Sequence, residues 1–201
     1  INIVGKYGSS VQTLLKKLSG LPVKIICPLH GPVLTGDLSG YLEKYDIWSS
    51  YRPEERGVLI AYASIYGNTA SAALRLRDML ARRGEKRVAA VDLARSDISR
   101  AVADAFRYDA LVLAAPSYDG AVLPPMAAFL SRLKAKNWQK RTAAVIENGS
   151  WAPSAGKVML AALAEMKDVA VLEPMVSIRS AVSEETATKL NELADALAAR
   201  G

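Results

Sequence analysis

Residues 58–70 read VLIAYASIYGNTA, a continuous apolar run that passes into a short turn containing hydroxyl side chains and a glycine. Sequence rich in alanine, leucine and arginine follows, and it predicts a helix directly behind the turn. A buried strand, a tight turn and the start of a helix bring the free N–H groups and the positive end of the helix dipole to one point. The stretch therefore predicts an anion-binding loop.

The residues of this loop that we expect to contact the anion are Ser64, Ile65, Tyr66, Gly67, Asn68 and Thr69. The glycine lets the backbone approach closely, and the serine and threonine offer hydroxyl donors. The loop is too short for a Walker A site and lacks both its lysine and the GxGxxG spacing of dinucleotide folds. A single phosphate group is therefore the better fit. The alternative is an ordinary strand–turn–helix connection built from turn and cap residues.

Length and composition indicate a globular protein. The chain has 201 residues, of which 51% are hydrophobic, enough for one core and a smaller appendage. No apolar run approaches the ~20 residues that cross a bilayer, and no stretch resembles a signal peptide. The single cysteine, Cys27, excludes an internal disulfide and suits a reducing compartment. We expect a cytoplasmic protein with no membrane partner.

The formal charge of +6 includes a basic cluster between Arg75 and Arg87. A nucleic-acid surface also needs interleaved aromatic residues or a groove-reading motif, and the cluster has neither. We interpret it as a solvated helix face and expect no nucleic-acid partner. It stays open that this basic cluster attracts an acidic protein partner electrostatically.

From Gly57 onward, apolar stretches alternate with helical ones. The expected strands are 58–63, 87–92, 110–115, 142–147 and 169–178, and the expected helices are 70–83, 97–106, 124–136, 155–166 and 184–199. Near-continuous apolar strands, each followed by a helix, are typical of a parallel sheet covered on both faces. This pattern predicts a doubly wound α/β domain with five parallel strands in the order 2-1-3-4-5.

Two further loops are predicted at the same edge of this sheet as the anion-binding loop. They are Pro116-Ser117-Tyr118-Asp119-Gly120 after the third strand and Asn148-Gly149-Ser150-Trp151 after the fourth. Each offers an aromatic ring among small residues, and two rings can sandwich a flat heteroaromatic ligand. The alternative for both rings is packing against the sheet edge. One phosphate and one planar ring together describe a mononucleotide.

These residues resemble a known family. Ser64-Ile65-Tyr66-Gly67-Asn68-Thr69 is similar to the phosphate loop S/T-x-T-G-x-T of flavodoxins, with Tyr66 in place of a threonine, so that a backbone N–H would take over one phosphate contact. The form Ser-x-Tyr-Gly-Asn-Thr resembles the flavodoxin half of flavodiiron proteins (A-type flavoproteins). The resemblance implies a flavodoxin-like domain over residues 57–201 that binds FMN through the three loops.

Residues 1–56 resemble the same family. A predicted strand at 23–27 runs into Cys27-Pro28-Leu29-His30-Gly31-Pro32, which is similar to the last iron-ligand segment of the metallo-β-lactamase-like domain. GYLEKYDIW, residues 40–48, resembles the helix that joins the two domains, and a further helix is predicted at 11–18. The resemblance implies a short remnant of the diiron domain. His30 would ligate iron only in a complete flavodiiron protein, and we expect this chain not to assemble a diiron centre because the family's H-x-E-x-D-H segment is absent.

The function implied by the resemblance is electron transfer by FMN in an oxidoreductase. In the complete family member, the flavin passes electrons to a diiron centre that reduces oxygen or nitric oxide, and protomers pair head to tail as homo-oligomers. The implied electron donor is an acidic protein, rubredoxin-like or NADH:rubredoxin reductase-like. No residue is expected to act as a catalytic acid or base, although Asp119 and Glu147 would disfavour an anionic reduced flavin if they faced the ring.

Two other functions stay open from the residues alone. The first is an NAD(P)H-dependent quinone or FMN reductase of flavodoxin-like fold, for which the sequence shows no distinct nicotinamide signal. The second is a non-enzymatic regulatory module of the same fold. A receiver module needs carboxylates at the ends of the first and third strands, where Ala63-Ser64 and Ala115-Pro116 lie.

Overall fold

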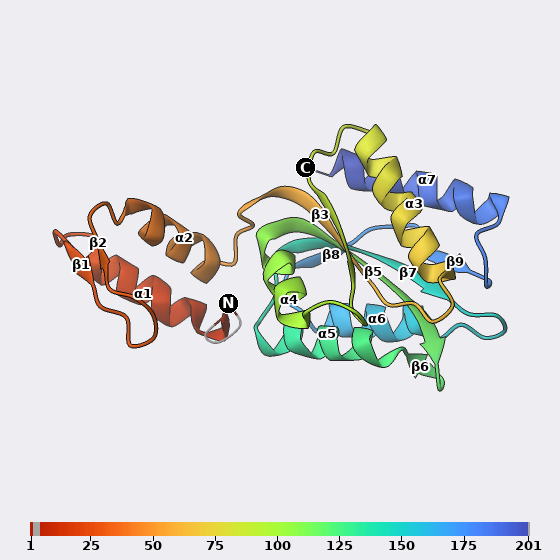
Figure 1. Ribbon diagram of the computed structural model, residues 1–201, viewed down its shortest axis with the longest axis horizontal. Helices are drawn as coiled ribbons and strands as arrows, with labels where there is room; N and C mark the ends of the chain where they lie inside the picture. Colours follow the sequence, from red (N-terminus) through yellow and green to blue (C-terminus); the bar gives the residue numbers. More distant parts are fainter. Residues whose placement is uncertain (2–4, 201) are drawn as a thin grey trace.

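The computed structural model describes residues 1 and 5–200 and consists of two parts (Figure 1). The larger part is a twisted sheet between two layers of helices. The smaller part, formed by the first fifty or so residues, lies beyond the amino ends of the strands, opposite the edge at which the predicted loops lie (Figure 1). None of the helices in the described ranges combines the length and apolar character that a bilayer span requires.

The main sheet confirms the predicted topology. Its strands are parallel and lie in the order β4-β3-β5-β7-β8, with β9 pairing to the far end of β7. Numbered by their position along the chain, the five predicted strands therefore lie across the sheet in the expected order 2-1-3-4-5. The strands are β3 (Glu55–Tyr62), β4 (Val88–Asp92), β5 (Tyr108–Tyr118), β7 (Arg141–Asn148), β8 (Val169–Val171) and β9 (Val176–Ile178).

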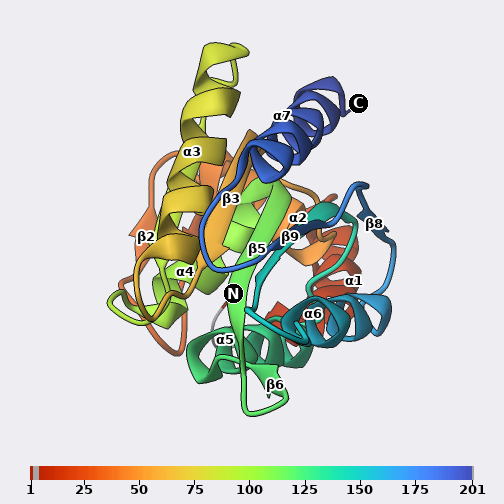
Figure 2. The same cartoon turned by 90° about the vertical axis from the view of Figure 1, so that its right-hand side faces the viewer.

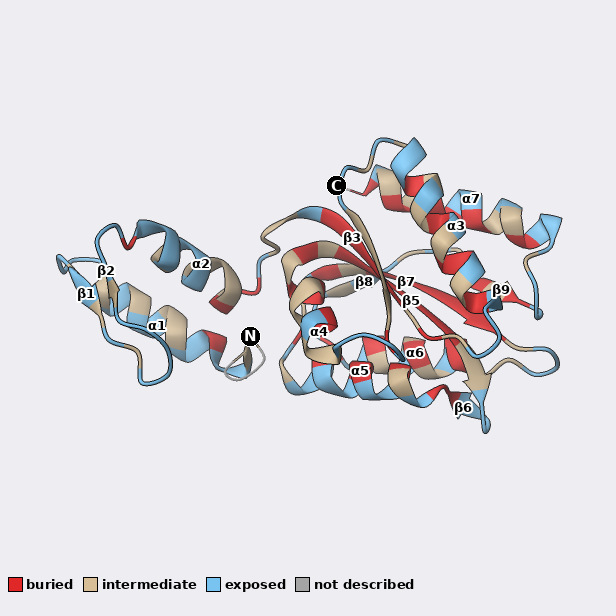
Figure 3. Ribbon diagram, viewed as in Figure 1, coloured by how far each residue is buried: buried red, intermediate tan, exposed pale blue. Residues whose placement is uncertain are grey.

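Helices cover both faces of the sheet (Figure 2). One layer holds α3 (Asn68–Arg82) and α7 (Glu184–Ala199), and the other holds α4 (Ile98–Arg107), α5 (Pro124–Ala135) and α6 (Ala155–Ala164). Strand β3 shows why both layers are needed. Val58 and Ile60 pack into the core under α3 and α7, while Leu59 and Ala61 pack into the opposite core, so that every one of these side chains is buried (Figure 3).

Two predicted strand boundaries are wrong. The fifth strand, expected to be continuous over residues 169–178, is divided into β8 and β9, and Pro174 between them has no N–H to donate to a ladder. Strand β5 does not end at Ala115 but continues to Tyr118 and pairs antiparallel with β6 (Ala121–Val122). Asp119 and Gly120 both have positive φ, 47° and 69°, as a two-residue hairpin turn requires. The Asp-Gly pair was the sequence signal for this hairpin.

The smaller part consists of two helices and a short hairpin. The expected helices correspond to α1 (Gly8–Leu18) and α2 (Ser39–Ser49), and the expected strand at 23–27 is reduced to β1 (Ile25–Ile26), which pairs with β2 (Leu34–Thr35). A short 3₁₀ turn, η1 (Gly5–Tyr7), precedes α1. The predicted division of the chain at residues 56 and 57 falls inside β3, and as a domain boundary it stays a prediction.

The two helices of the smaller part approach each other closely. A Cβ on Gly8 would lie 2.4 Å from the Ser49 carbonyl oxygen and 2.6 Å from the Tyr51 ring, so only glycine fits at this position. Gln12 crosses the same contact and donates to the Asp46 carboxylate and the Ser49 hydroxyl, both at 2.8 Å. The contact fixes the end of α2, from which the chain enters β3.

A buried guanidinium group joins the two parts. Arg141 is only 4% exposed, and burial lowers its pKa to about 10, so that it is still charged at neutral pH. Its N–H groups donate to five backbone carbonyl oxygens, at 2.6 Å to Tyr51 and Phe106, 2.8 Å to Tyr108, 3.0 Å to Gln139 and 3.1 Å to Lys140. One side chain thus holds the segment after α2 against the beginning of β5.

We expect Arg141→Met to lower the free energy of unfolding by about 3 kcal/mol or more, because buried carbonyl groups lose a charged donor and gain no other partner. Urea denaturation followed by circular dichroism measures the change. The matched control is Arg132→Met, since Arg132 lies exposed on α5 with one long hydrogen bond to Ser99. Equal stability of the two variants would contradict the role assigned to Arg141.

Candidate functional site

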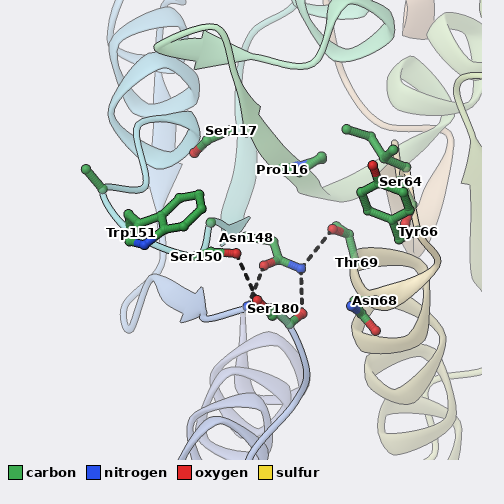
Figure 4. Close-up of a pocket in the computed structure, with 13 residues that line it drawn as sticks. Ser64, Tyr66, Asn68, Thr69, Pro116, Ser117, Asn148, Ser150, Trp151 and Ser180 are labelled. Atoms are coloured by element: carbon green, nitrogen blue, oxygen red, sulfur yellow. Dashed lines mark hydrogen bonds between the residues drawn. The ribbon is translucent and has the colours of Figure 1, made fainter.

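A pocket of about 300 Å³ opens at the carboxyl edge of the sheet, where the predicted loops meet (Figure 4). Most of its lining consists of predicted site residues: Ser64, Ile65, Tyr66, Asn68, Thr69, Pro116, Ser117, Asn148, Gly149, Ser150 and Trp151. Ala152 and Ser180 complete it. Four predicted residues lie outside the lining, namely Gly67, Tyr118, Asp119 and Gly120.

Helix α3 presents an open N-terminus to this pocket. Its N-cap residue, Gly67, has a left-handed backbone with φ of 88° and provides no side-chain cap. Nothing lies within 4 Å of the position that a Cβ would take there, so it is the backbone conformation and not space that favours glycine. The Gly67 N–H donates to the Ser64 hydroxyl at 3.1 Å, and Asn68 and Thr69 line the pocket. The first turn of α3 can therefore receive an anion.

Helix α6, whose start borders the same pocket, is closed to such a ligand. The Ser117 hydroxyl accepts from the N–H groups of Ser154 at 2.7 Å and Ala155 at 3.1 Å, and the Glu147 carboxylate accepts from the Gly156 N–H at 2.7 Å. Side chains from β5 and β7 thus satisfy the first donors of α6. Glu147 is 5% exposed and absent from the pocket lining, so it does not face a ligand there.

Two aromatic rings stand on opposite sides of the pocket (Figure 4). Trp151 and Tyr66 are 94% and 91% exposed, which leaves their faces free for a planar ligand. The sequence identified Trp151 as one of the two rings but paired it with Tyr118. Because β5 continues into its hairpin, Tyr118 is carried away from the lining, and Tyr66 of the anion-binding loop is the ring that lies across from Trp151.

The floor of the pocket is a hydrogen-bonded group of polar residues. Asn148 contacts the backbone of Ser180 and the hydroxyl of Thr69, and the hydroxyls of Ser150 and Ser180 are 2.9 Å apart. Ser180 was not predicted. It follows β9, and the rule that ligands bind at the carboxyl ends of parallel strands would have included it had the end of the fifth strand been treated like the others.

His30, the predicted metal ligand, lies exposed in the segment between β1 and β2. Figure 1 shows β1 and β2 in the smaller part, beyond the amino ends of the main-sheet strands. Within the described residues, no three side chains of the types His, Cys, Asp and Glu come together in a metal-binding arrangement. The described residues therefore do not fit a diiron centre.

A family model described as a flavodoxin domain matches residues 59–180. The putative diflavin flavoprotein A 4 of Synechocystis sp. is 36% identical over 75 residues, which cover 37% of this chain and 13% of that protein. The putative diflavin flavoprotein A 2 of Thermosynechococcus vestitus is 27% identical over 148 residues, or 72% of this chain and 25% of that protein.

Solved structures share the fold of nearly all of this chain. The rubredoxin oxygen:oxidoreductase of Desulfovibrio gigas has a TM-score of 0.89 at 22% identity, and the flavodiiron protein of Giardia intestinalis one of 0.84 at 24% identity. Each match covers 98% of this chain and 49% of the other, so the chain spans about half the length of these proteins. Together these matches confirm the predicted resemblance and fold class.

We expect Ser117→Ala to lower the free energy of unfolding by about 1 kcal/mol, because the first turn of α6 loses the hydroxyl that caps it. Thermal denaturation at constant protein concentration measures the change. Ser71→Ala is the control, since Ser71 lies exposed on α3 and alanine is the better helix former. A stability loss no larger than that of the control would show that Ser117 is not a cap.

Proposed function

The chain belongs to the flavodoxin-domain family, and from this membership we propose that it holds one FMN in the pocket at the carboxyl edge and serves as an electron-transfer domain. A single observation carries the proposal. The open N-terminus of α3 and the two exposed rings of Tyr66 and Trp151 border one pocket, and a mononucleotide with a planar ring is the ligand that uses all three.

The phosphate would lie at the first turn of α3. The backbone N–H groups of Ile65, Tyr66, Asn68 and Thr69, together with the hydroxyls of Ser64 and Thr69, are the donors available to it, since the Gly67 N–H already donates to Ser64. The helix dipole favours the negative charge of the phosphate. The site offers one such cradle, because Ser117 and Glu147 already occupy the start of α6. This supports FMN over FAD, whose pyrophosphate needs a longer track of donors.

The flat ring system would lie between Trp151 and Tyr66, with the polar floor of Asn148, Ser150 and Ser180 beneath the linking chain. FMN, when bound, supplies hydride and single-electron chemistry that protein side chains lack. The residues of the pocket bind and orient the ring. None of them is assigned a proton-transfer role.

The wider role follows the flavodiiron resemblance. We propose that the domain accepts electrons from an acidic donor protein of rubredoxin or NADH:rubredoxin reductase type, which the net charge of +6 would attract. In a complete flavodiiron protein, His30 would be an iron ligand, the electrons would pass to the diiron centre for reduction of oxygen or nitric oxide, and the protein would be a cytoplasmic homo-oligomer.

The alternatives are less well supported. A receiver-type module would need carboxylates at the ends of β3 and β5, where Ala63 and Ala115 are buried. A quinone or FMN reductase would use the same flavin pocket and would in addition need a nicotinamide site. Oxidation of NADPH or NADH by the flavin-loaded protein, in the absence of a donor protein, would favour that alternative.

The first test is the identity of the cofactor. We expect the purified protein, as isolated or after incubation with FMN, to show the visible absorption of oxidised flavin and to release FMN on acid treatment. Chromatography against FMN, FAD and riboflavin standards identifies what is released. Release of FAD, or no flavin uptake at all, would overturn the proposed function.

The second test addresses the ring site. We expect Trp151→Ala to weaken binding of FMN and of riboflavin alike, by about 1 kcal/mol or roughly five-fold, because both ligands lose the same ring contact. Trp151→Phe, which keeps an aromatic face, should retain most of the affinity. Titration followed by flavin fluorescence gives both dissociation constants, and unchanged affinity in the alanine variant would contradict the sandwich arrangement.

A further inference from the structure

The polar floor of the pocket contains a side chain that can act on the ligand through another residue. Asn148 is 7% exposed and lies at the end of β7. It connects Ser180, on the segment after β9, with Thr69, in the first turn of α3 (Figure 4). Three elements that are far apart in the sequence therefore meet at one amide group.

The orientation of this amide is fixed by the backbone of Ser180. The Asn148 oxygen Oδ1 accepts from the Ser180 N–H at 3.1 Å, and Nδ2 donates to the Ser180 carbonyl oxygen at 2.9 Å. Rotating the amide by half a turn would place acceptor against acceptor and donor against donor. Ser180 is itself held in a left-handed conformation, with φ of 66°, so its N–H and carbonyl both face the same side chain.

The remaining N–H of the amide determines what the Thr69 hydroxyl can do. Nδ2 lies 3.3 Å from Thr69 Oγ1 and can only donate, so the hydroxyl accepts there. Among the described residues, no hydrogen bond has the Thr69 hydroxyl as donor, although Thr69 is only 2% exposed. Its proton is thus available to a ligand at the first turn of α3.

We propose that Asn148 is a positioning residue, which presents the Thr69 hydroxyl to the phosphate as a fixed donor. The inference rests on the proposed FMN site. In this proposal Asn148 does not itself contact the phosphate. The part of the FMN affinity that the phosphate provides depends on Asn148 and Thr69 acting together. A residue that only held the pocket in shape would instead affect every flavin equally.

The experiment compares FMN with riboflavin, which lacks the phosphate. Thr69→Val should weaken FMN binding about ten-fold or more, because a hydrogen bond to a charged group is lost, and leave riboflavin binding within about two-fold. Asn148→Ala should weaken FMN binding by several-fold and change riboflavin binding by no more than about two-fold. In the double variant, Asn148→Ala should add almost nothing to the effect of Thr69→Val, since its effect passes through the missing hydroxyl.

Two further variants keep the test independent of folding. Asn148→Asp retains the acceptor for the Ser180 N–H, but it places an acceptor against both Thr69 and the Ser180 carbonyl and adds a negative charge near the phosphate. We therefore expect FMN binding to be weakened more strongly than in Asn148→Ala, with riboflavin binding affected less than FMN binding. Asn191→Ala, on the exposed face of α7, is the matched control and should bind both flavins as the original protein does. Circular dichroism establishes that each variant is folded.

The outcomes separate the two hypotheses. If the unmodified protein binds neither FMN nor riboflavin, the proposed function fails. If it binds FMN, and Asn148→Ala weakens both flavins in parallel or adds its full effect to that of Thr69→Val, then Asn148 is a structural residue and the inference is overturned. A loss restricted to FMN, with non-additive effects of the two substitutions, supports it.

Discussion

The common direction of the strands is the constraint on which the site depends. Because β4, β3, β5, β7 and β8 are all parallel, and the central strands β3, β5 and β7 are buried on both faces, their carboxyl ends reach one edge, and the segments that follow them must lie side by side. Loops separated by more than a hundred residues thereby come to border a single pocket. The side chains suited to bind an anion, to stack on a planar ring and to contact the atoms between the two thus come from several loops and not from one.

Within this edge, the difference between two helix starts decides where an anion can bind. Both α3 and α6 begin beside the pocket, and both carry a positive dipole end. Ser117 and Glu147 satisfy the first N–H groups of α6, whereas the start of α3 has a glycine N-cap and no side-chain cap. Composition alone does not distinguish the two helices, since serine lies near the start of each. The capping contacts come from neighbouring strands.

At the opposite edge, Arg141 joins the smaller part to the sheet. Its five carbonyl contacts lie at the amino ends of the strands, on the far side of the sheet from the pocket. The smaller part exposes several large apolar side chains, among them Leu21, Leu29 and Val33, and its two helices bury few residues of their own. It is attached to the sheet through this buried charge and through Tyr51, whose ring packs on Phe106 in the core beneath α4 and α5.

The sequence by itself determined the sheet, its strand order and the strand–turn–helix connection that we propose binds the anion, because continuous apolar runs, their alternation with helices and the SIYGNT turn are local patterns. It did not determine which tyrosine lies across the pocket from Trp151, because Tyr66 and Tyr118 both belong to loops predicted at this edge. Only the β5–β6 hairpin, which was not predicted from the sequence, leaves Tyr118 outside the lining. Nor did it reveal Ser180 or the role of Asn148. Their hydrogen bonds join β7, β9 and α3, and only the packing of these elements brings such distant residues within 3.3 Å of one another.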